Sequence, residues 1–271
     1  MMGSEEVLRE VKAQARRLIP GARVGVAVSS LETGEQFGWN QDVVFPGCSV
    51  VKVAILVELF RQYRQGIIDL DAPVTVTEDT GGQRGSGILK HLRLPVSLSV
   101  RNLATLMIIV SDNVASNCIT DLVGREAVNA SMRQLGRGGI ILRRPFIGAA
   151  VTDLDQDNVC TAEAVCGLLA DIHSGRACDQ EAGRWMIDIL SRQQFRSRIP
   201  RYLPKGTVVA NKTGTQPVSV HDAGLVYPEE GAPFSLCVLC TQVEDRGRAE
   251  EFIARTAKII HEYHTTGGGR R

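Results

Sequence analysis

The chain carries a serine and a lysine whose spacing could support nucleophilic catalysis. Ser49 stands at the start of an apolar run, and Lys52 follows it by three residues. Residues at this spacing share one face of a helix, so a helix that begins here would bring the amine within reach of the hydroxyl. A serine hydroxyl is a poor nucleophile until a neighbouring base takes its proton. The unpaired backbone N–H groups of a helix start, including that of Ser49, could also stabilise an oxyanion.

Lys52 can act as this base only if its pKa falls from about 10.4 toward neutrality. Two causes are available, namely burial among Val51, Val53 and Ile55 and a second cation nearby. The alternative is that Ser49 only caps the helix while Lys52 extends to solvent. Taken alone, the Ser-x-x-Lys spacing favours this alternative.

Two further motifs change that balance. Ser111-Asp112-Asn113 and then Lys212-Thr213-Gly214-Thr215 follow the only Ser-x-x-Lys of the chain. Ser-x-x-Lys, Ser-Asp-Asn and Lys-Thr-Gly in this order are typical of class A β-lactamases and penicillin-binding proteins. The sequence therefore resembles the class A β-lactamase-like serine hydrolases. The resemblance extends from a predicted strand pair near residue 23 to the last predicted helix.

The resemblance implies a role for each polar residue of the motifs. Ser49 would be the acylated nucleophile, and Lys52 its proton acceptor or relay. Ser111 would pass a proton to the leaving nitrogen, and Lys212 would hold Ser111 and a substrate carboxylate, since a fixed cation pairs with an anion in a cleft of low dielectric. The amide of Asn113 would bond the acylamido side chain of a substrate.

The stretch after Lys212 would complete the substrate-binding residues with Thr213, Gly214 and Thr215. Gly214 has no side chain and would let the substrate approach the strand edge. The backbone N–H of Thr215 would join that of Ser49 as the oxyanion hole, where each donor is typically worth about 10²–10³ in rate.

One element of the class A pattern is absent. In that family a Glu-x-x-Leu-Asn pattern supplies the glutamate that activates the deacylating water, and residues 146–158 contain no glutamate and no such pattern. Asp153, Asp155 and Asp157 could substitute, although the expected role of each is a solvated loop carboxylate. The sequence thus supports acylation better than turnover, and no deacylation base is assigned.

The order of the expected elements predicts one α/β (α+β) domain over residues 1–271. Helices are expected at 5–19, 50–66, 98–110, 115–123, 125–135, 161–174, 181–194 and 250–263, and strands at 24–31, 35–39, 207–211, 220–227 and 234–243, with a short extended piece at 74–76. Strands at both ends imply a β-lactamase/transpeptidase-like antiparallel sheet assembled from the two termini and flanked by helices. Residues 1–48 and 205–271 would form this sheet lobe, and residues 49–204 an inserted all-helical lobe.

Composition limits the classes of partner. The 271 residues are 44% apolar and 23% charged with a formal net charge of +1, which is ordinary for a soluble globular protein and implies no polyanion-binding field. A nucleic-acid partner is disfavoured, and a small-molecule substrate, a β-lactam or a related amide or ester, is expected. Oligomeric state stays open.

Location and cofactors follow from what the sequence lacks. Residues 1–6 contain no apolar signal segment, and no later stretch is long enough to span a bilayer. We expect a cytoplasmic protein, or a secreted or periplasmic one whose signal peptide has been removed. Seven irregularly spaced cysteines indicate a reducing compartment. Cys237-x-x-Cys240 has no second pair and lies in an apolar run, so no metal and no cofactor are expected.

Three functions remain open at this point. The first is an acyl-serine hydrolase acting on β-lactams or related amides and esters. The alternatives are a D-Ala-D-Ala-type peptidase, for which the missing glutamate is natural, and a penicillin-recognising sensor that is acylated once. His221-Asp222 resembles a catalytic dyad, but adjacent residues of a strand point to opposite faces, which favours a structural role.

Overall fold

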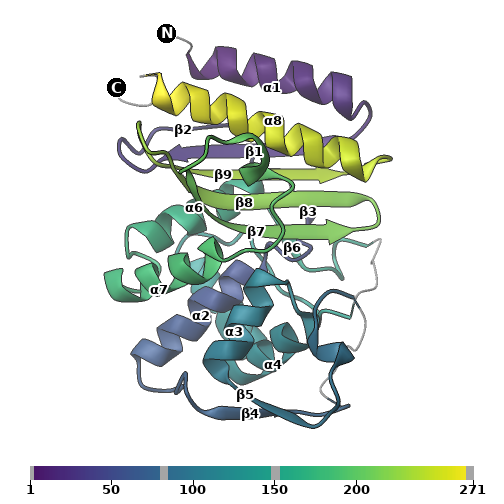
Figure 1. Ribbon diagram of the computed structural model, residues 1–271, viewed down its shortest axis with the longest axis vertical. Helices are drawn as coiled ribbons and strands as arrows, with labels where there is room; N and C mark the ends of the chain where they lie inside the picture. Colours follow the sequence, from purple (N-terminus) through teal and green to yellow (C-terminus); the bar gives the residue numbers. More distant parts are fainter. Residues whose placement is uncertain (1–2, 80–84, 148–152, 267–271) are drawn as a thin grey trace.

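The computed structural model describes residues 3–79, 85–147 and 153–266, and its centre is a five-stranded antiparallel sheet (Figure 1). Its strands are β1 (Arg23–Ser30), β2 (Gln36–Trp39), β7 (Val208–Gln216), β8 (Ser219–Tyr227) and β9 (Phe234–Thr241). The spatial order is β2-β1-β9-β8-β7, and β1 pairs with β9 in a register that sets Val26 opposite Val238. The predicted antiparallel sheet assembled from both termini is confirmed.

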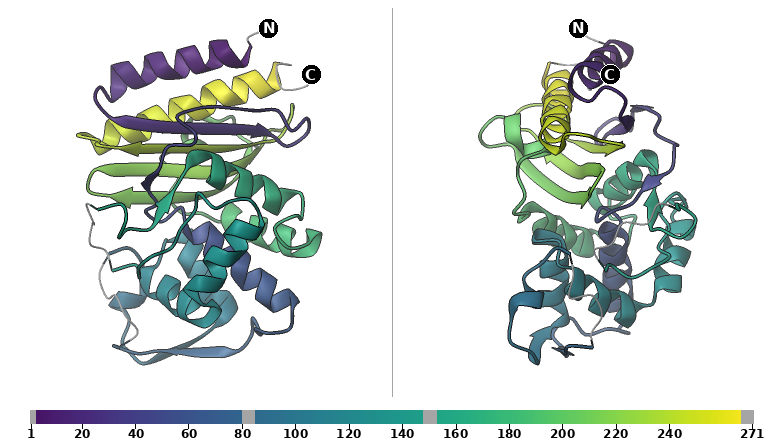
Figure 2. Two further views of the ribbon diagram at one scale, coloured as in Figure 1. Left: turned by 180° about the vertical axis from the view of Figure 1, so that it is seen from behind. Right: turned by 90° about the vertical axis from the view of Figure 1, so that its right-hand side faces the viewer.

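Two terminal helices, α1 (Ser4–Leu18) and α8 (Arg246–Thr265), pack against each other and against this sheet. Both are amphipathic, and their buried stripes, with Val7 and Val11 from α1 and Phe252 from α8, join the inward residues of β1 and β9 in one core. Figures 1 and 2 show both helices at one end of the molecule, while the helices from the middle of the chain lie at the other end.

The middle of the chain is largely helical. It contains α2 (Lys52–Arg64), α3 (Val100–Ile109), α4 (Asn113–Val123), α5 (Arg125–Gln134), α6 (Ala162–His173), α7 (Gln180–Ser191) and the short 3₁₀ helices η1 (Leu89–His91) and η2 (Ile199–Tyr202). Every residue of α2 from Lys52 to Phe60 is buried, so α2 forms the centre of this second core. Helix α6 packs on β1 and β9 and joins this core to the sheet.

The sequence suggested an all-helical stretch over residues 49–204, but the structure contains strands there as well. Strands β4 (Pro73–Val76) and β5 (Val96–Ser99) form a two-stranded antiparallel sheet, and β3 (Phe45–Pro46) pairs with β6 (Val159–Cys160). Leu98, expected inside a helix, lies in β5 opposite Val74. The Ser99 side chain accepts a hydrogen bond from Asn102 N and caps α3, a boundary that apolar periodicity alone does not mark.

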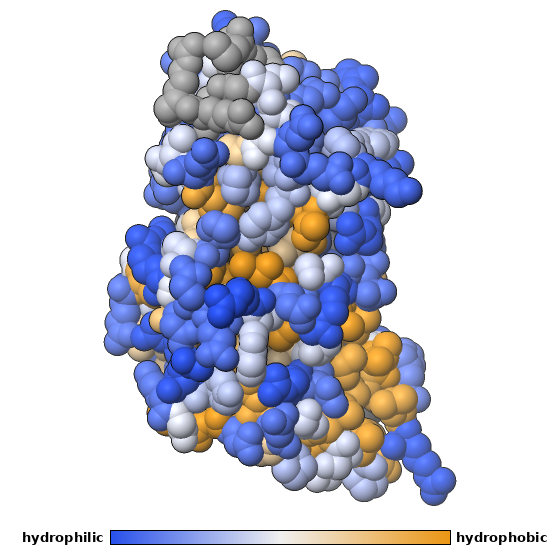
Figure 3. Space-filling view, turned by 60° about the vertical axis from the view of Figure 1, so that its left-hand side comes forward, coloured by the Kyte–Doolittle hydropathy of each residue, from blue (hydrophilic) through white to orange (hydrophobic). Residues whose placement is uncertain are grey.

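The surface is mixed in character. On the face shown in Figure 3, hydrophilic residues separate the apolar ones over the upper part, and apolar residues gather toward the lower end. Among the residues that the structure describes, no helix combines the length and the apolar character needed to cross a bilayer.

Candidate active site

Ser49 lies on the turn that leads into α2, three residues before the first residue of the helix. The helix begins at Lys52, and Lys52 N donates to Ser49 O at 3.3 Å, so the sequence placed the helix start slightly early. The preceding residues are anchored, since Gly47 N donates to Asn158 O at 2.6 Å. Cys48 has φ of +47°, a conformation that is sparsely populated for residues other than glycine and that concentrates at functional sites.

Gly214 brings strand β7 against this turn. A Cβ at Gly214 would lie 2.9 Å from Cys48 Cβ and 3.2 Å from Ser49 N, so any side chain here would push the strand away from the nucleophile. The glycine was expected to admit a substrate, and the contact seen is with the chain's own turn. Because β7 is the edge strand of the sheet, part of its backbone is not paired with β8. Thr215 and Ser49 line the same cavity, which keeps both expected oxyanion-hole residues together.

Lys52 is fully buried and is bound to the second motif. Its Nζ donates to Ser111 O at 2.8 Å, to Ser111 Oγ at 3.3 Å and to Asn113 Oδ1 at 2.9 Å. Burial lowers the pKa of Lys52 well below its usual value, and the neighbouring Lys212 lowers it further. These are the two causes that the sequence offered. Within the described residues no hydrogen bond joins the Ser49 hydroxyl to Lys52 Nζ, and such bonds often form only when substrate binds.

Lys212 is also fully buried, and its Nζ donates to Thr213 O at 2.7 Å. Burial lowers the pKa of Lys212 to about 7, against the opposing effect of Asp222. In the described part of the chain no hydrogen bond connects Lys212 with Ser111, although both side chains lie within the electrostatic reach of Lys52. The two lysines therefore form a pair of easily deprotonated amines.

The Ser-Asp-Asn triplet is fixed by its central carboxylate. Asp112 is fully buried; its Oδ1 accepts from Ala115 N at 3.0 Å and caps α4, while its Oδ2 accepts from Ile88 N and Leu89 N. Ser111 has φ of +57°, which turns its side chain away from the regular path between α3 and α4. The carboxylate thus holds the turn that presents Ser111 and Asn113.

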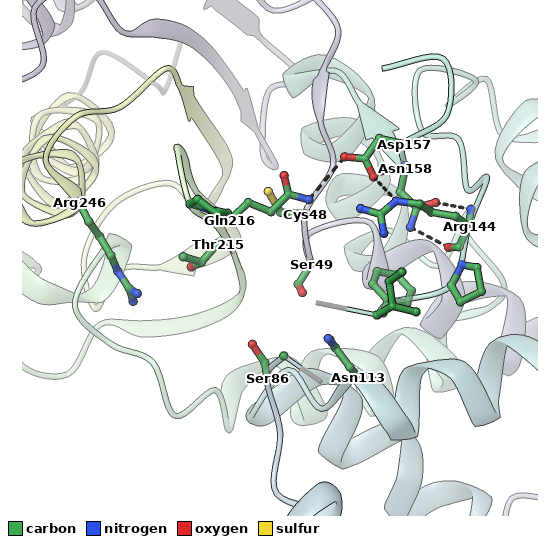
Figure 4. A pocket seen from close by; sticks show the side chains of 15 residues that line it. Cys48, Ser49, Ser86, Asn113, Arg144, Asp157, Asn158, Thr215, Gln216 and Arg246 are labelled. Carbon is green, nitrogen blue, oxygen red and sulfur yellow. Dashed lines mark hydrogen bonds and ion pairs between the residues drawn. The ribbon is translucent and has the colours of Figure 1, made fainter. Parts of the chain in front are cut away.

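A cavity of about 330 Å³ opens in front of Ser49. Figure 4 shows the Ser49 hydroxyl directed toward Ser86 and Asn113, with Thr215 on one side and Arg144 on the other. A smaller cavity of about 200 Å³ adjoins it and is lined by Ser49, Ser111 and Thr213, among others. Since Lys52 binds the Oδ1 atom of Asn113, the Nδ2 end faces the cavity (Figure 4).

Sequence reasoning missed Arg198, a buried cation at the end of the smaller cavity. Its Nη1 donates to Gly214 O at 2.9 Å and to His221 O at 2.6 Å, and its Nη2 donates to Thr215 Oγ1 at 2.7 Å. Its partners lie far along the chain, so no local pattern marks it. Arg246, at the start of α8, lines both cavities beside it.

His221 and Asp222 do not form a dyad. His221 is held between Pro46 O, at 2.8 Å from Nε2, and Cys240 N, which donates to Nδ1 at 3.1 Å. Asp222 accepts from Ile199 N and from the Asn211 amide. The structural role favoured by the sequence agrees with these contacts.

Comparison with known proteins decides the family. A model of the beta-lactamase enzyme family matches residues 6–264. The chain belongs to this family. With its fold and its three motifs, it is a class A β-lactamase-like serine hydrolase.

Relatives of this β-lactamase-like chain include enzymes and a regulator. Beta-lactamase Toho-1 of Escherichia coli is 28% identical over 246 residues, covering 89% of this chain and 84% of that protein. Beta-lactamase regulatory protein BlaB of Streptomyces cacaoi is 23% identical over 309 residues, covering 97% and 98%. Among solved structures, the beta-lactamase of Sphaerobacter thermophilus DSM 20745 superimposes with a TM-score of 0.88 at 28% identity, covering 94% of this chain and 96% of that one.

The segment 146–158 of the β-lactamase-like site contributes Phe146, Ile147 and Asp157 to the lining of the cavity. Residues 148–152 of the 146–158 segment lie outside the described residues. Asp153 and Asp155 are exposed, as expected, but Asp157 is buried, which corrects the expectation of a solvated carboxylate. Its Oδ1 accepts from Arg144 Nε at 2.8 Å and from Asn158 N at 2.8 Å, so its charge is already paired.

Phe146 takes a central place in this segment of the β-lactamase-like site. It is 8% exposed, lines the cavity of Ser49, and lies with its ring centroid 4.7 Å from Lys52 Nζ. Sequence reasoning gave it no role. An apolar aromatic ring therefore lies beside the candidate base on this side of the cavity.

Proposed function

We propose that the protein is an acyl-serine hydrolase in which Ser49 forms an acyl-enzyme with β-lactams or related amides and esters. The observation that carries this proposal is the buried Lys52, whose Nζ contacts Ser111 and Asn113 beside the cavity of Ser49. A buried amine with a lowered pKa next to a serine is the arrangement that nucleophilic catalysis needs.

In the acylation step Ser49 Oγ attacks the carbonyl carbon and its proton passes to the neutral amine of Lys52. A new C–O bond forms, and the negative charge on the carbonyl oxygen is met by Ser49 N and Thr215 N. The C–N or C–O bond to the leaving group then breaks. Ser111 Oγ lies 3.3 Å from Lys52 Nζ, so the proton has a short path through Ser111 to the leaving atom.

Anion recognition falls to the cations on the other side of the nucleophile. Lys212, Arg198 and Arg246 surround the smaller cavity or lie against its lining residues, and both arginines also pair with Glu250. Lys212 would hold a substrate carboxylate with the two arginines beside it, while the Nδ2 end of Asn113 would bond an acylamido carbonyl. The substrate thus spans the two cavities with its scissile bond at Ser49.

Deacylation would be the slow step, and a natural ester or amide other than a β-lactam would be the physiological substrate. This part of the proposal is supported by the paired state of Asp157 and by the absence of a glutamate from residues 146–158. The resemblance to a protein named as a β-lactamase regulator favours a second candidate, a sensor that is acylated once and not turned over. A D-Ala-D-Ala-type peptidase stays a further alternative.

The test is covalent labelling with a fluorophosphonate probe and with a penicillin, followed by peptide mapping. We expect one adduct, on Ser49, that disappears in Ser49→Ala. Ser191→Ala, at the end of α7 with its hydroxyl on Asp188 O, is the matched control and should label normally. Unchanged labelling of Ser49→Ala would reject the nucleophile assignment.

A further inference from the structure

Phe146 is a close neighbour of the candidate base. Three acceptor atoms, Ser111 O, Ser111 Oγ and Asn113 Oδ1, lie within hydrogen-bond distance of Lys52 Nζ. The Phe146 ring is the fourth neighbour, with its centroid 4.7 Å from Nζ. A ring face attracts the cation but gives a water molecule no conventional hydrogen-bond partner.

The backbone of Phe146 is anchored by the side chain of Asn117. Phe146 N donates to Asn117 Oδ1 at 2.9 Å, and Asn117 Nδ2 donates to Phe146 O at 3.2 Å. Asn117 belongs to α4, the helix that also presents Asn113, and is itself buried. The segment that carries the ring is therefore fastened to the helix that positions the rest of the site.

Hydrolysis of an acyl-Ser49 ester needs a water that acylation does not. The water oxygen must bond to the acyl carbon while one water proton goes to a base; the ester C–O bond then breaks and Ser49 Oγ recovers a proton. Lys52 is the base nearest to Ser49 on the chain, and the carboxylate of Asp157 is committed to Arg144. Water must then reach the space beside Lys52 Nζ, where the ring lies.

We propose that Phe146 keeps hydrolytic water away from Lys52 in the acyl-enzyme and so sets the lifetime of acyl-Ser49. The inference rests on the proposed function, because it concerns the fate of the acyl group that Ser49 takes up. It assigns to Phe146 a role in deacylation, which the lifetime of the adduct reports once the adduct has formed. Removing the ring should therefore raise the deacylation rate constant, whatever it does to the rate of acylation.

The test follows acyl-Ser49 by intact mass spectrometry after a short exposure to benzylpenicillin and removal of excess reagent. Once acylated, Phe146→Ala should lose its adduct about tenfold faster or more than the unmodified protein, a part of the 10²–10⁴ that general-base catalysis supplies. Phe146→Leu keeps an apolar cover and should hold its adduct as long as the unmodified protein does. Phe37→Ala, a ring removed from β2 in the sheet lobe, is the control for the loss of an aromatic side chain.

Each outcome decides between the two proposals. Normal acylation of Phe146→Ala with an unchanged adduct lifetime overturns the role of Phe146 and leaves the proposed function standing. Hydrolysis of benzylpenicillin by the unmodified protein with no adduct at any time overturns the present inference and leaves the proposed function standing. Neither hydrolysis nor an adduct, with benzylpenicillin or with the fluorophosphonate probe, overturns the proposed function and the present inference with it. Should Phe146→Ala fail to fold, as judged by circular dichroism, Phe146→Val replaces it, and an unchanged adduct lifetime there overturns the role equally.

Discussion

The two sides of the cavity around Ser49 use their polar groups differently. On the side of α2 and α4, Lys52 is buried with a lowered pKa and is shared between Ser111 and Asn113. On the side of residues 144–158, the one buried carboxylate among the described residues, Asp157, is bound to an arginine and the next side chain on the cavity is a phenyl ring. The first side therefore contains an amine that can accept a proton. On the second side the buried carboxylate is paired with an arginine, and the neighbouring side chain is an apolar ring.

This difference teaches that forming and breaking an acyl-enzyme can be separated in one fold. Acylation needs a base and an oxyanion hole close to the nucleophile, and the candidates are Lys52 at the start of α2 for the base and the N–H groups of Ser49 and Thr215 for the oxyanion hole. Deacylation needs, in addition, a water with its own base. The experiments below ask whether each side does what its chemistry allows.

The largest effect is expected from Lys52. Lys52→Ala removes the base and should reduce the acylation rate constant by about 10²–10⁴, measured by stopped-flow or quenched labelling with a penicillin. Lys52→Arg keeps the positive charge but cannot accept a proton at neutral pH. It should therefore be as slow as Lys52→Ala, and acylation restored by the arginine would show that Lys52 acts only through its charge.

A smaller and substrate-dependent effect is expected from Lys212. A hydrogen bond to a charged group is worth about 1.5–3 kcal/mol. Lys212→Ala should therefore lower kcat/KM for carboxylate-bearing substrates by about 10–100-fold. The kcat/KM for a neutral ester such as p-nitrophenyl acetate should fall by a smaller factor. Equal losses for both substrates would remove the anion-binding role from this residue.

The pH dependence of substrate binding sharpens the same point. Burial lowers the pKa of Lys212 to about 7, so its charge is present below this pH and is lost as the pH rises through it. The KM of a carboxylate-bearing substrate should therefore rise between pH 7 and 9, while that of p-nitrophenyl acetate stays level. A KM that is flat for both, measured in buffers of constant ionic strength, would contradict a titrating Lys212 in the binding site.

The smallest effects on turnover are expected from the three aspartates near the cavity. Asp157→Asn breaks the pair with Arg144 and should lower the free energy of unfolding by about 1–3 kcal/mol, seen as a lower Tm, with deacylation unchanged. Asp153→Asn and Asp155→Asn alter exposed carboxylates and should change stability by less than about 0.5 kcal/mol. Loss of deacylation with intact acylation in any one of them would identify it as the missing base.

Sequence patterns predicted the sheet and the cluster of motif residues well. Strands β1 and β9 are mainly apolar, and the motif residues Ser49 and Ser111 both line the smaller cavity. The two causes proposed for a lowered pKa of Lys52, burial and a second cation, are both present. These features could be predicted because they depend on residues that lie close together in the sequence.

Contacts between distant single residues could not be predicted in the same way. The ring of Phe146 reaches Lys52, and Arg198 reaches β7 and β8, with no signal in the neighbouring residues of either. Asp157 looks like its two exposed neighbours in sequence, and only the position of Arg144 makes it a buried ion pair. Strand β5 was missed because Leu98 continues the apolar run of α3 across a serine cap.

The most direct test of the account is a time course of intact mass and product release for the unmodified protein mixed with benzylpenicillin. An acyl-enzyme that resists its own hydrolysis predicts a burst of product equal to the protein present, an adduct on Ser49 within the burst, and a slow steady state afterwards. Rapid hydrolysis without a burst, and with no adduct at any time, would contradict the separation of acylation from deacylation.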